Sequence, residues 1–139
     1  KCATCHFIPL FNGVVPPAFE KTESEVLGVP ETAANQKLDS DVGRYAIIDV
    51  PPYLNAFKTM GLRNAGLTAP YMHNGIYQTL EEVMDFYNRG GGEGMGIRVD
   101  NQTLSPEPLN LSKEEITDII SFLNALSDDV ALKSINNAG

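Results

Sequence analysis

The chain has 139 residues, of which 42% are hydrophobic and 20% are charged, proportions typical of a globular protein with one main domain. Ten lysines and arginines against eighteen aspartates and glutamates give a formal net charge of −8. An acidic surface of this kind repels nucleic acid and anionic lipid, and no apolar run is long enough for a membrane span. The bulk numbers therefore argue against nucleic-acid-binding and membrane-spanning proteins, whereas a basic protein partner would suit the charge.

The N-terminal motif, residues 2–6, contains both cysteines of the chain and one of its two histidines: Cys2-Ala3-Thr4-Cys5-His6. A thioredoxin-like thiol pair can have this spacing, but it normally lies beside a strand–helix–strand pattern, which the sequence does not show. A zinc site could combine the motif with distant His73, but structural zinc sites normally have a second closely spaced ligand pair. Both interpretations remain open as alternatives to a third, which uses all three reactive residues.

The third interpretation is a covalently attached haem, for which C-x-x-C-H is the attachment motif. Each thiol adds to one haem vinyl group, so Cys2 and Cys5 would hold the porphyrin through two thioethers. The next residue, His6, would then lie under the iron as its proximal ligand. We favour haem c over the redox pair and the zinc site.

The first part of the chain contains few signals of regular structure. Residues from Cys2 to about Phe7 are expected to form the end of a truncated helix that Pro9 stops, and we expect the chain to be a fragment. Residues 13–57 show little periodicity and several prolines, which indicates a long loop with turns. A loop of this length is unusual in a compact domain, unless it wraps a large apolar group such as a haem. A short helix is compatible with Asn55–Leu62.

Two helices are indicated in the second half of the chain, each by a capping box, in which a Thr or Ser side chain and a Glu three residues later satisfy each other's backbone amides. The first box joins Thr79 to Glu82, and the second joins Ser112 to Glu115. Apolar residues follow both boxes at helical spacing: Leu80, Val83, Met84 and Tyr87 in the first helix, and Ile116, Ile119, Ile120, Leu123 and Leu126 in the second. No strand pattern is convincing, so the prediction is an all-α fold.

Several long stretches resemble one protein family: CATCH, LGVPETAANQKLDSDVGRY, FKTMGLRNAGLTAPYMHNGIYQTLEEVMDFYNRGG and LNLSKEEITDIISFLNALS. They are similar to the C-terminal haem domain of bacterial di-haem cytochrome c peroxidases and their MauG-like relatives. The resemblance implies an all-α cytochrome c-like fold, with long loops wrapped around one c-type haem and with its first helix truncated. The haem domain would cover residues 1–127, and residues 128–139 would be a frayed tail.

The resemblance also implies a function for the parent protein, a periplasmic enzyme that reduces hydrogen peroxide with electrons from a small redox protein. This chain would be its electron-transfer domain. Its partners would be the N-terminal haem domain of the same parent chain, the electron-donor protein and, as a further candidate, a second copy of the parent in a homodimer. The fragment alone is expected to do little peroxide chemistry, because a six-coordinate haem has no open position.

Further ligands are implied only by the resemblance. A calcium ion lies between the two domains in the family, and two of its backbone oxygen ligands would come here from Thr68 and Pro70; such oxygens suit a hard cation. The sixth iron ligand would be Tyr87, where peroxidases generally have Met and MauG-like members have Tyr. Met84 is the rival ligand, and Met60, Met72 and His73 are further candidates. Arg63 is a candidate contact for a haem propionate.

Tyr87 leaves the function open between two alternatives, because phenolate ligation favours ferric and higher oxidation states whereas a thioether raises the haem potential. A MauG-like di-haem oxidase domain is therefore an alternative to the peroxidase domain. A stand-alone mono-haem electron carrier is another alternative.

Overall fold

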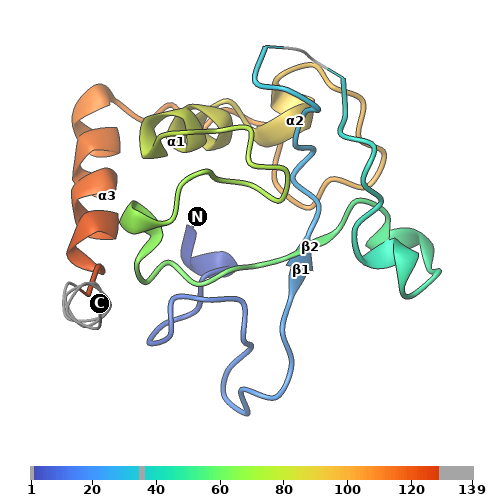
Figure 1. The fold of residues 1–139 in the computed structure, drawn as a ribbon, viewed down its shortest axis with the longest axis horizontal. Coiled ribbons are helices and arrows are strands. Elements are labelled where there is room, and N and C mark those ends of the chain that lie inside the picture. The colour runs from blue at the N-terminus through green and yellow to red at the C-terminus, as the bar shows by residue number, and fades with distance from the viewer. Residues whose placement is uncertain (1, 35–36, 129–139) are drawn as a thin grey trace, which may run out of the picture.

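The computed structural model describes residues 2–34 and 37–128, in which short helices and strands are joined by long irregular loops (Figure 1). Three elements are α-helices: α1 (Leu80–Asn88), α2 (Gly91–Gly94) and α3 (Lys113–Ala125). The remaining elements are two strands and four 3₁₀ helices: η1 (Cys2–Thr4), β1 (Ser24–Glu25), η2 (Arg44–Ala46), η3 (Pro51–Tyr53), β2 (Phe57–Lys58) and η4 (Ala65–Leu67). The predicted tail, residues 128–139, lies outside the described residues except for Asp128.

The prediction of an all-α fold was wrong, because β1 and β2 form an antiparallel two-stranded sheet. Ser24 pairs with Lys58 and Glu25 pairs with Phe57. Each strand has only two residues, too few for an alternating pattern to be visible in the sequence. The short helix considered for Asn55–Leu62 is also wrong, since β2 lies inside that range and Asn55 has a left-handed φ of 57°.

The predicted helices α1 and α3 are confirmed, together with both capping boxes. In α1 the amide of Glu82 donates to Thr79 Oγ1 at 3.2 Å, and the amide of Thr79 donates to Glu82 Oε2 at 3.0 Å. Ser112 and Glu115 make the same reciprocal pair at the start of α3, at 3.2 and 2.8 Å. A cap of this kind contributes about 1 kcal/mol, so purely local chemistry fixes where both helices begin.

The buried core is small and divided into two clusters of apolar side chains, with a few further buried residues outside them. One cluster lies around β1 and β2, and the other joins α1 to the preceding loop. Their members are Val26, Ala56, Ile97 and Val99 in the first, and Val29, Tyr77 and Phe86 in the second. The apolar stripe of α3 buries only Leu123 fully, so much apolar surface of this helix has no cover.

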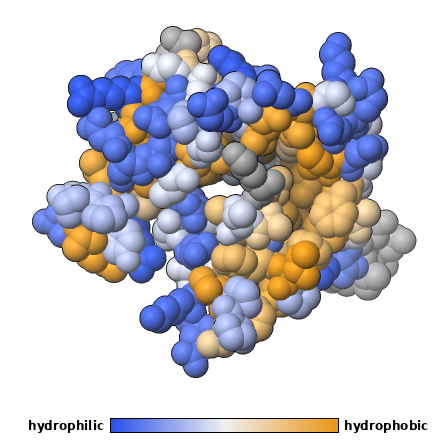
Figure 2. All heavy atoms as spheres, turned by 180° about the vertical axis from the view of Figure 1, so that it is seen from behind, coloured by the Kyte–Doolittle hydropathy of each residue, from blue (hydrophilic) through white to orange (hydrophobic). Residues whose placement is uncertain are grey.

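Helix α3 packs mainly against α1 and η4. Its Phe122 ring also meets the ring of Phe11, in the loop after η1, edge to face at 5.7 Å. This contact joins α3 to the loop that follows the N-terminal motif. Figure 2 shows apolar side chains gathered beside a central hollow on one face of the molecule. None of the described helices is both long and apolar enough to cross a membrane.

Candidate functional site

The N-terminal motif folds as one tight turn near the middle of the molecule in Figure 1. The amides of Cys5 and His6 both donate to the carbonyl of Cys2, at 3.2 and 2.9 Å. The expected helix end is therefore a 3₁₀ turn, and it places the two cysteines one turn apart with the imidazole directly after them. Both thiols are free; that of Cys2 is exposed and that of Cys5 is partly buried.

The imidazole of His6 is partly buried, and its Nδ1 atom has no hydrogen-bond partner among residues 2–34 and 37–128. Burial lowers the pKa of this ring, an effect that the backbone of Phe11 and Met60 and the carboxylate of Glu25 only partly oppose. The ring is therefore neutral at pH 7, and neutral imidazole is the form that binds a metal. A buried ring nitrogen without a partner is costly in a complete site, so this histidine suits a bound iron.

Tyr87 faces the motif from α1. The residue is partly buried, and burial, followed by the charges of Cys2, Cys5 and Glu25, raises the pKa of its phenol to about 12. Its ring packs edge to face on Phe86 at 5.6 Å. The phenol thus lies within electrostatic reach of both thiols, although α1 is far from the motif in the sequence.

Met84, the rival ligand, lies one turn before Tyr87 on α1 and is 5% exposed. For Met84 the structure shows burial alone, whereas for Tyr87 it also shows an electrostatic interaction with both cysteines. The remaining candidates fit less well. Met60 is 68% exposed, and Met72 packs on the cluster of Val29, Tyr77 and Phe86.

His73 is engaged elsewhere in the fold. Its ring stacks on Phe57, with centroids 3.6 Å apart and planes 10° apart. Its Nε2 atom lies 3.4 Å from Asp39 Oδ1, and the neighbouring Asn74 donates to Asp39 Oδ2 at 3.0 Å. Through these described contacts, His73 connects its own loop to Phe57 and to Asp39. It is therefore not part of the N-terminal motif.

Glu25 is a site residue that sequence reasoning missed. Its carboxylate acts on the pKa values of Cys5, His6 and Tyr87, all of which it raises. The β1–β2 pairing places Glu25 beside Phe57, and nothing local in a stretch without periodicity indicates that position. A negatively charged side chain thus lies within electrostatic reach of Cys5, His6 and Tyr87.

The environment of Cys5 argues against the thiol-redox alternative. Burial is the largest effect and raises the pKa of this thiol, and the carboxylates of Glu25 and Glu23 raise it further, while the Thr4 hydroxyl acts in the opposite direction. A reactive redox thiol needs a lowered pKa, normally from a nearby cation or a helix N-terminus. The zinc alternative lacks support too, since the described residues include no group of three or more His, Cys, Asp or Glu that could hold a metal ion.

Arg63 and the loop after η4 complete the predicted set. The guanidinium of Arg63 lies 5.7 Å from the ring centroid of Phe11, which places this arginine beside the loop that follows the motif. Thr68 and Pro70 are exposed, and the Thr68 hydroxyl donates to the carbonyl of Ala65 at 3.4 Å. The contacts of these residues neither support nor contradict a propionate or calcium role, so both roles stay predictions.

The chain is similar to several cytochrome c peroxidases and MauG proteins, whereas no protein-family model matches it. Cytochrome-c peroxidase IdrP2 of Denitromonas iodatirespirans is 44% identical over 90 residues, which are 65% of this chain and 22% of that protein. Methylamine utilization protein MauG of Methylorubrum extorquens is 33% identical over 97 residues, 68% of this chain and 26% of that protein. The chain thus spans about a quarter of the length of these relatives.

A solved structure shares the fold. It is the crystal structure of a MauG-like protein associated with microbial copper homeostasis, which is 24% identical in sequence and has a TM-score of 0.66. The match covers 92% of this chain and 42% of that protein. The match is consistent with the cytochrome c-like arrangement, in which the long loops belong to the fold.

Proposed function

Because this chain belongs to the family of cytochrome c peroxidases and MauG-like proteins, we propose that it is a haem c domain that transfers electrons within a larger periplasmic di-haem peroxidase. One observation carries the proposal: the two free thiols of a motif that ends in a neutral, partly buried imidazole lie within electrostatic reach of the Tyr87 phenol. Haem c bound there supplies a one-electron redox centre. The whole protein would use it to reduce hydrogen peroxide with electrons from a small donor protein.

The residues of the motif have separate tasks in this proposal. Cys2 and Cys5 anchor the haem covalently, and the turn that joins them through Cys2 O fixes their spacing. His6 offers a ring nitrogen that burial keeps unprotonated. Exposed apolar side chains around the motif give the porphyrin an apolar surface to cover: Leu10 is 42%, Met60 68% and Phe122 49% exposed.

The position of Tyr87 favours a second candidate function, that of a MauG-like oxidase domain. A phenolate ligand stabilises ferric and higher oxidation states of haem iron, so the domain would store oxidising equivalents instead of accepting electrons from a donor. The pKa of about 12 shows that the phenol is protonated at pH 7 in the protein alone. Ligation through this oxygen therefore requires the phenol to lose its proton to solvent or to a neighbouring base.

The rest of the proposal concerns the parent protein. Its N-terminal haem domain would bind peroxide, and the carbonyls of Thr68 and Pro70 would contribute to a calcium site between the two domains, since backbone oxygens suit that ion. Arg63 would contact a haem propionate. We place the parent in the periplasm and include a homodimer among its assemblies.

The test uses the mature full-length protein and its Cys2→Ala/Cys5→Ala variant, in which both attachment points for the haem of this domain are removed. We expect the variant to lose turnover of hydrogen peroxide with a reduced small cytochrome as donor, because electrons no longer enter through this haem. Full turnover in a variant shown by mass to lack this haem would overturn the proposal. A wild-type protein that forms a stable high-valent state but accepts no electrons from the cytochrome would favour the MauG-like function.

A further inference from the structure

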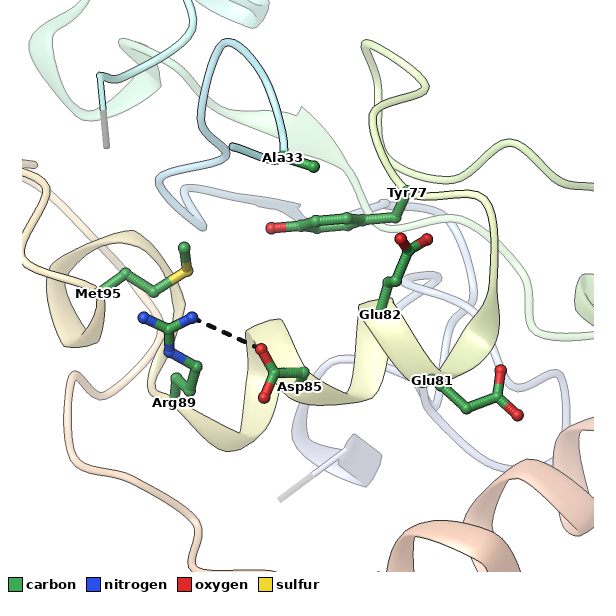
Figure 3. Close-up of a pocket in the computed structure, with 7 residues that line it drawn as sticks. All are labelled: Ala33, Tyr77, Glu81, Glu82, Asp85, Arg89 and Met95. Carbon is green, nitrogen blue, oxygen red and sulfur yellow. Dashed lines mark ion pairs between the residues drawn. The ribbon is translucent and has the colours of Figure 1, made fainter. Parts of the chain in front are cut away.

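A separate hollow, here called the Tyr77 groove, lies against α1 and has a volume of about 380 Å³ (Figure 3). Tyr77 and Ala33 line one side of it. The other side is lined by α1 and its C-terminal cap, with Glu81, Glu82, Asp85 and Arg89. Met95, which follows α2, closes one end. None of the residues proposed to hold the haem lines this groove, so its function can be tested independently of the proposed function.

Tyr77 lines the groove with a buried ring and a hydroxyl that opens into the hollow. The residue is 6% exposed, and its ring packs on Phe86 with centroids 5.7 Å apart. Its hydroxyl makes no hydrogen bond with any residue in the described ranges, yet Figure 3 shows it reaching over the groove. Burial, with the carboxylates of Asp85 and Glu82, raises the pKa of this hydroxyl. The hydroxyl therefore stays protonated and opens into the groove without a hydrogen bond to the described residues, so that a ligand in the groove can bond it.

The opposite wall of the groove carries excess negative charge. Glu82 Oε2 accepts from the amides of Gln78 and Thr79, at 2.6 and 3.0 Å, which holds this carboxylate in place. Asp85 meets Arg89 at 3.6 Å, but both side chains are about half exposed or more, and such pairs contribute little. Three carboxylates against one guanidinium leave a net negative wall, and the ion pair of Asp85 with Arg89 is weak.

The geometry of the groove suits a large cation with a delocalised charge better than a metal ion. The described residues do not bring three or more acidic, histidine or cysteine side chains close enough for a metal ion. In Figure 3 the Tyr77 ring is seen almost edge-on, and one face of it looks toward the carboxylates of Glu82 and Asp85. A planar cation between them would contact the ring face, as cations favour, and would donate hydrogen bonds to the carboxylates.

We infer that the Tyr77 groove binds an organic cation of the guanidinium or ammonium type. The thioether of Met95 and the methyl group of Ala33 suit the alkyl stem of such a group, while Tyr77, Glu82 and Asp85 suit its head. The overall charge of −8 also favours the approach of cations. Two sources share this chemistry: a free small molecule, and an arginine or lysine side chain presented by a protein.

The test is calorimetric titration of the mature full-length protein with N-acetyl-arginine amide and with its neutral analogue N-acetyl-citrulline amide. We expect the arginine compound to bind and the citrulline compound not to bind. Asp85→Asn should weaken binding about five- to tenfold, since it removes a hydrogen bond to a charged group. Tyr77→Leu should weaken it by a similar factor, since it removes the ring face that the cation contacts. Glu114→Gln is the matched control, because it makes an equal charge change in the first turn of α3, outside the groove.

Arg89→Gln should tighten binding, which is a result that a misfolded variant would not give. This change removes the internal guanidinium that competes for Asp85, and we expect the affinity for the arginine compound to rise about threefold or more. A blocked Gly-Arg-Gly peptide that binds tenfold tighter than N-acetyl-arginine amide would identify a protein-borne side chain, and equal affinity a free small molecule. Citrulline binding as tight as arginine binding, or affinities unchanged in Asp85→Asn and Arg89→Gln, would overturn the inference.

Discussion

Tyr87 of helix α1 lies close enough to Cys5 of the N-terminal motif for the charge of this cysteine to raise the pKa of the phenol. The same is true of Cys2, so both attachment residues and the phenol share one site. The two proposed iron ligands therefore come from different elements: His6 belongs to the N-terminal motif, and Tyr87 belongs to the capped helix α1. It also provides the first prediction.

Replacing Tyr87 by Phe should change the visible and EPR spectra of the mature full-length protein and raise the reduction potential of one haem. The reason is that loss of a phenolate ligand no longer favours ferric iron. Met84→Leu is the matched control, one turn away on the same helix, and it should leave both readouts unchanged. The opposite pattern, with a spectrum altered by Met84→Leu and not by Tyr87→Phe, would make Met84 the ligand.

Glu25→Gln should raise the potential of the same haem. The carboxylate acts on Cys5, His6 and Tyr87, and a negative charge near the iron stabilises its oxidised state, so neutralising that charge makes reduction easier. The control is Glu114→Gln, an equal charge change in the first turn of α3. Potentiometric titration of both variants gives the measurement, and equal potentials in wild type and Glu25→Gln would contradict the placement of Glu25.

Helices α1 and α3 could be predicted because their capping signals are local. The position of Glu25 near the N-terminal motif could not be predicted. Thr79 and Glu82 are three positions apart, so their capping box is visible in the sequence. The pairing of Glu25 with Phe57 is not visible, because it joins two-residue strands across a long loop. The attachment motif was contiguous and therefore easy to find, but the carboxylate beside it depends entirely on long-range pairing.

Asp39→Asn should destabilise the protein at pH 7 without changing the haem spectrum. Hydrogen bonds from the Asn74 side chain and the Asp41 amide, and then the nearby His73 ring, lower the pKa of Asp39. A carboxyl group with a lowered pKa stabilises the fold above its unfolded pKa of 3.8 and loses that effect as the pH falls through the lower folded value. We expect a loss of about 1–2 kcal/mol in the free energy of unfolding at pH 7.

Chemical denaturation at pH 7 and at pH 3 gives the measurement for Asp39→Asn, and the difference from wild type should shrink at the lower pH. His73→Gln serves as the companion variant and should also leave the haem spectrum unchanged, because the ring is stacked on Phe57. A changed spectrum in His73→Gln would instead show that this histidine reaches an iron.

Gly92→Ala should destabilise the protein by about 1–3 kcal/mol, the usual cost of overpacking. Gly92 is buried at the start of α2, and an added Cβ would collide with the backbone of Gly28, from the loop after β1. Gly61→Ala is the control, since the nearest atom to its added Cβ is Asn12 Cβ at 3.8 Å. Thermal unfolding of the two variants tests this contact, and equal stabilities would show that α2 does not pack on this loop.

The most direct test of the haem site is mass spectrometry of the proteolytic peptide that contains residues 2–6, taken from full-length protein matured where haem c is attached. We expect this peptide to carry one haem bound through Cys2 and Cys5, and the Cys5→Ala peptide to keep at most one thioether. A peptide at its bare polypeptide mass, from protein whose other attachment motif is fully loaded, would contradict the assignment of this chain as a haem c domain.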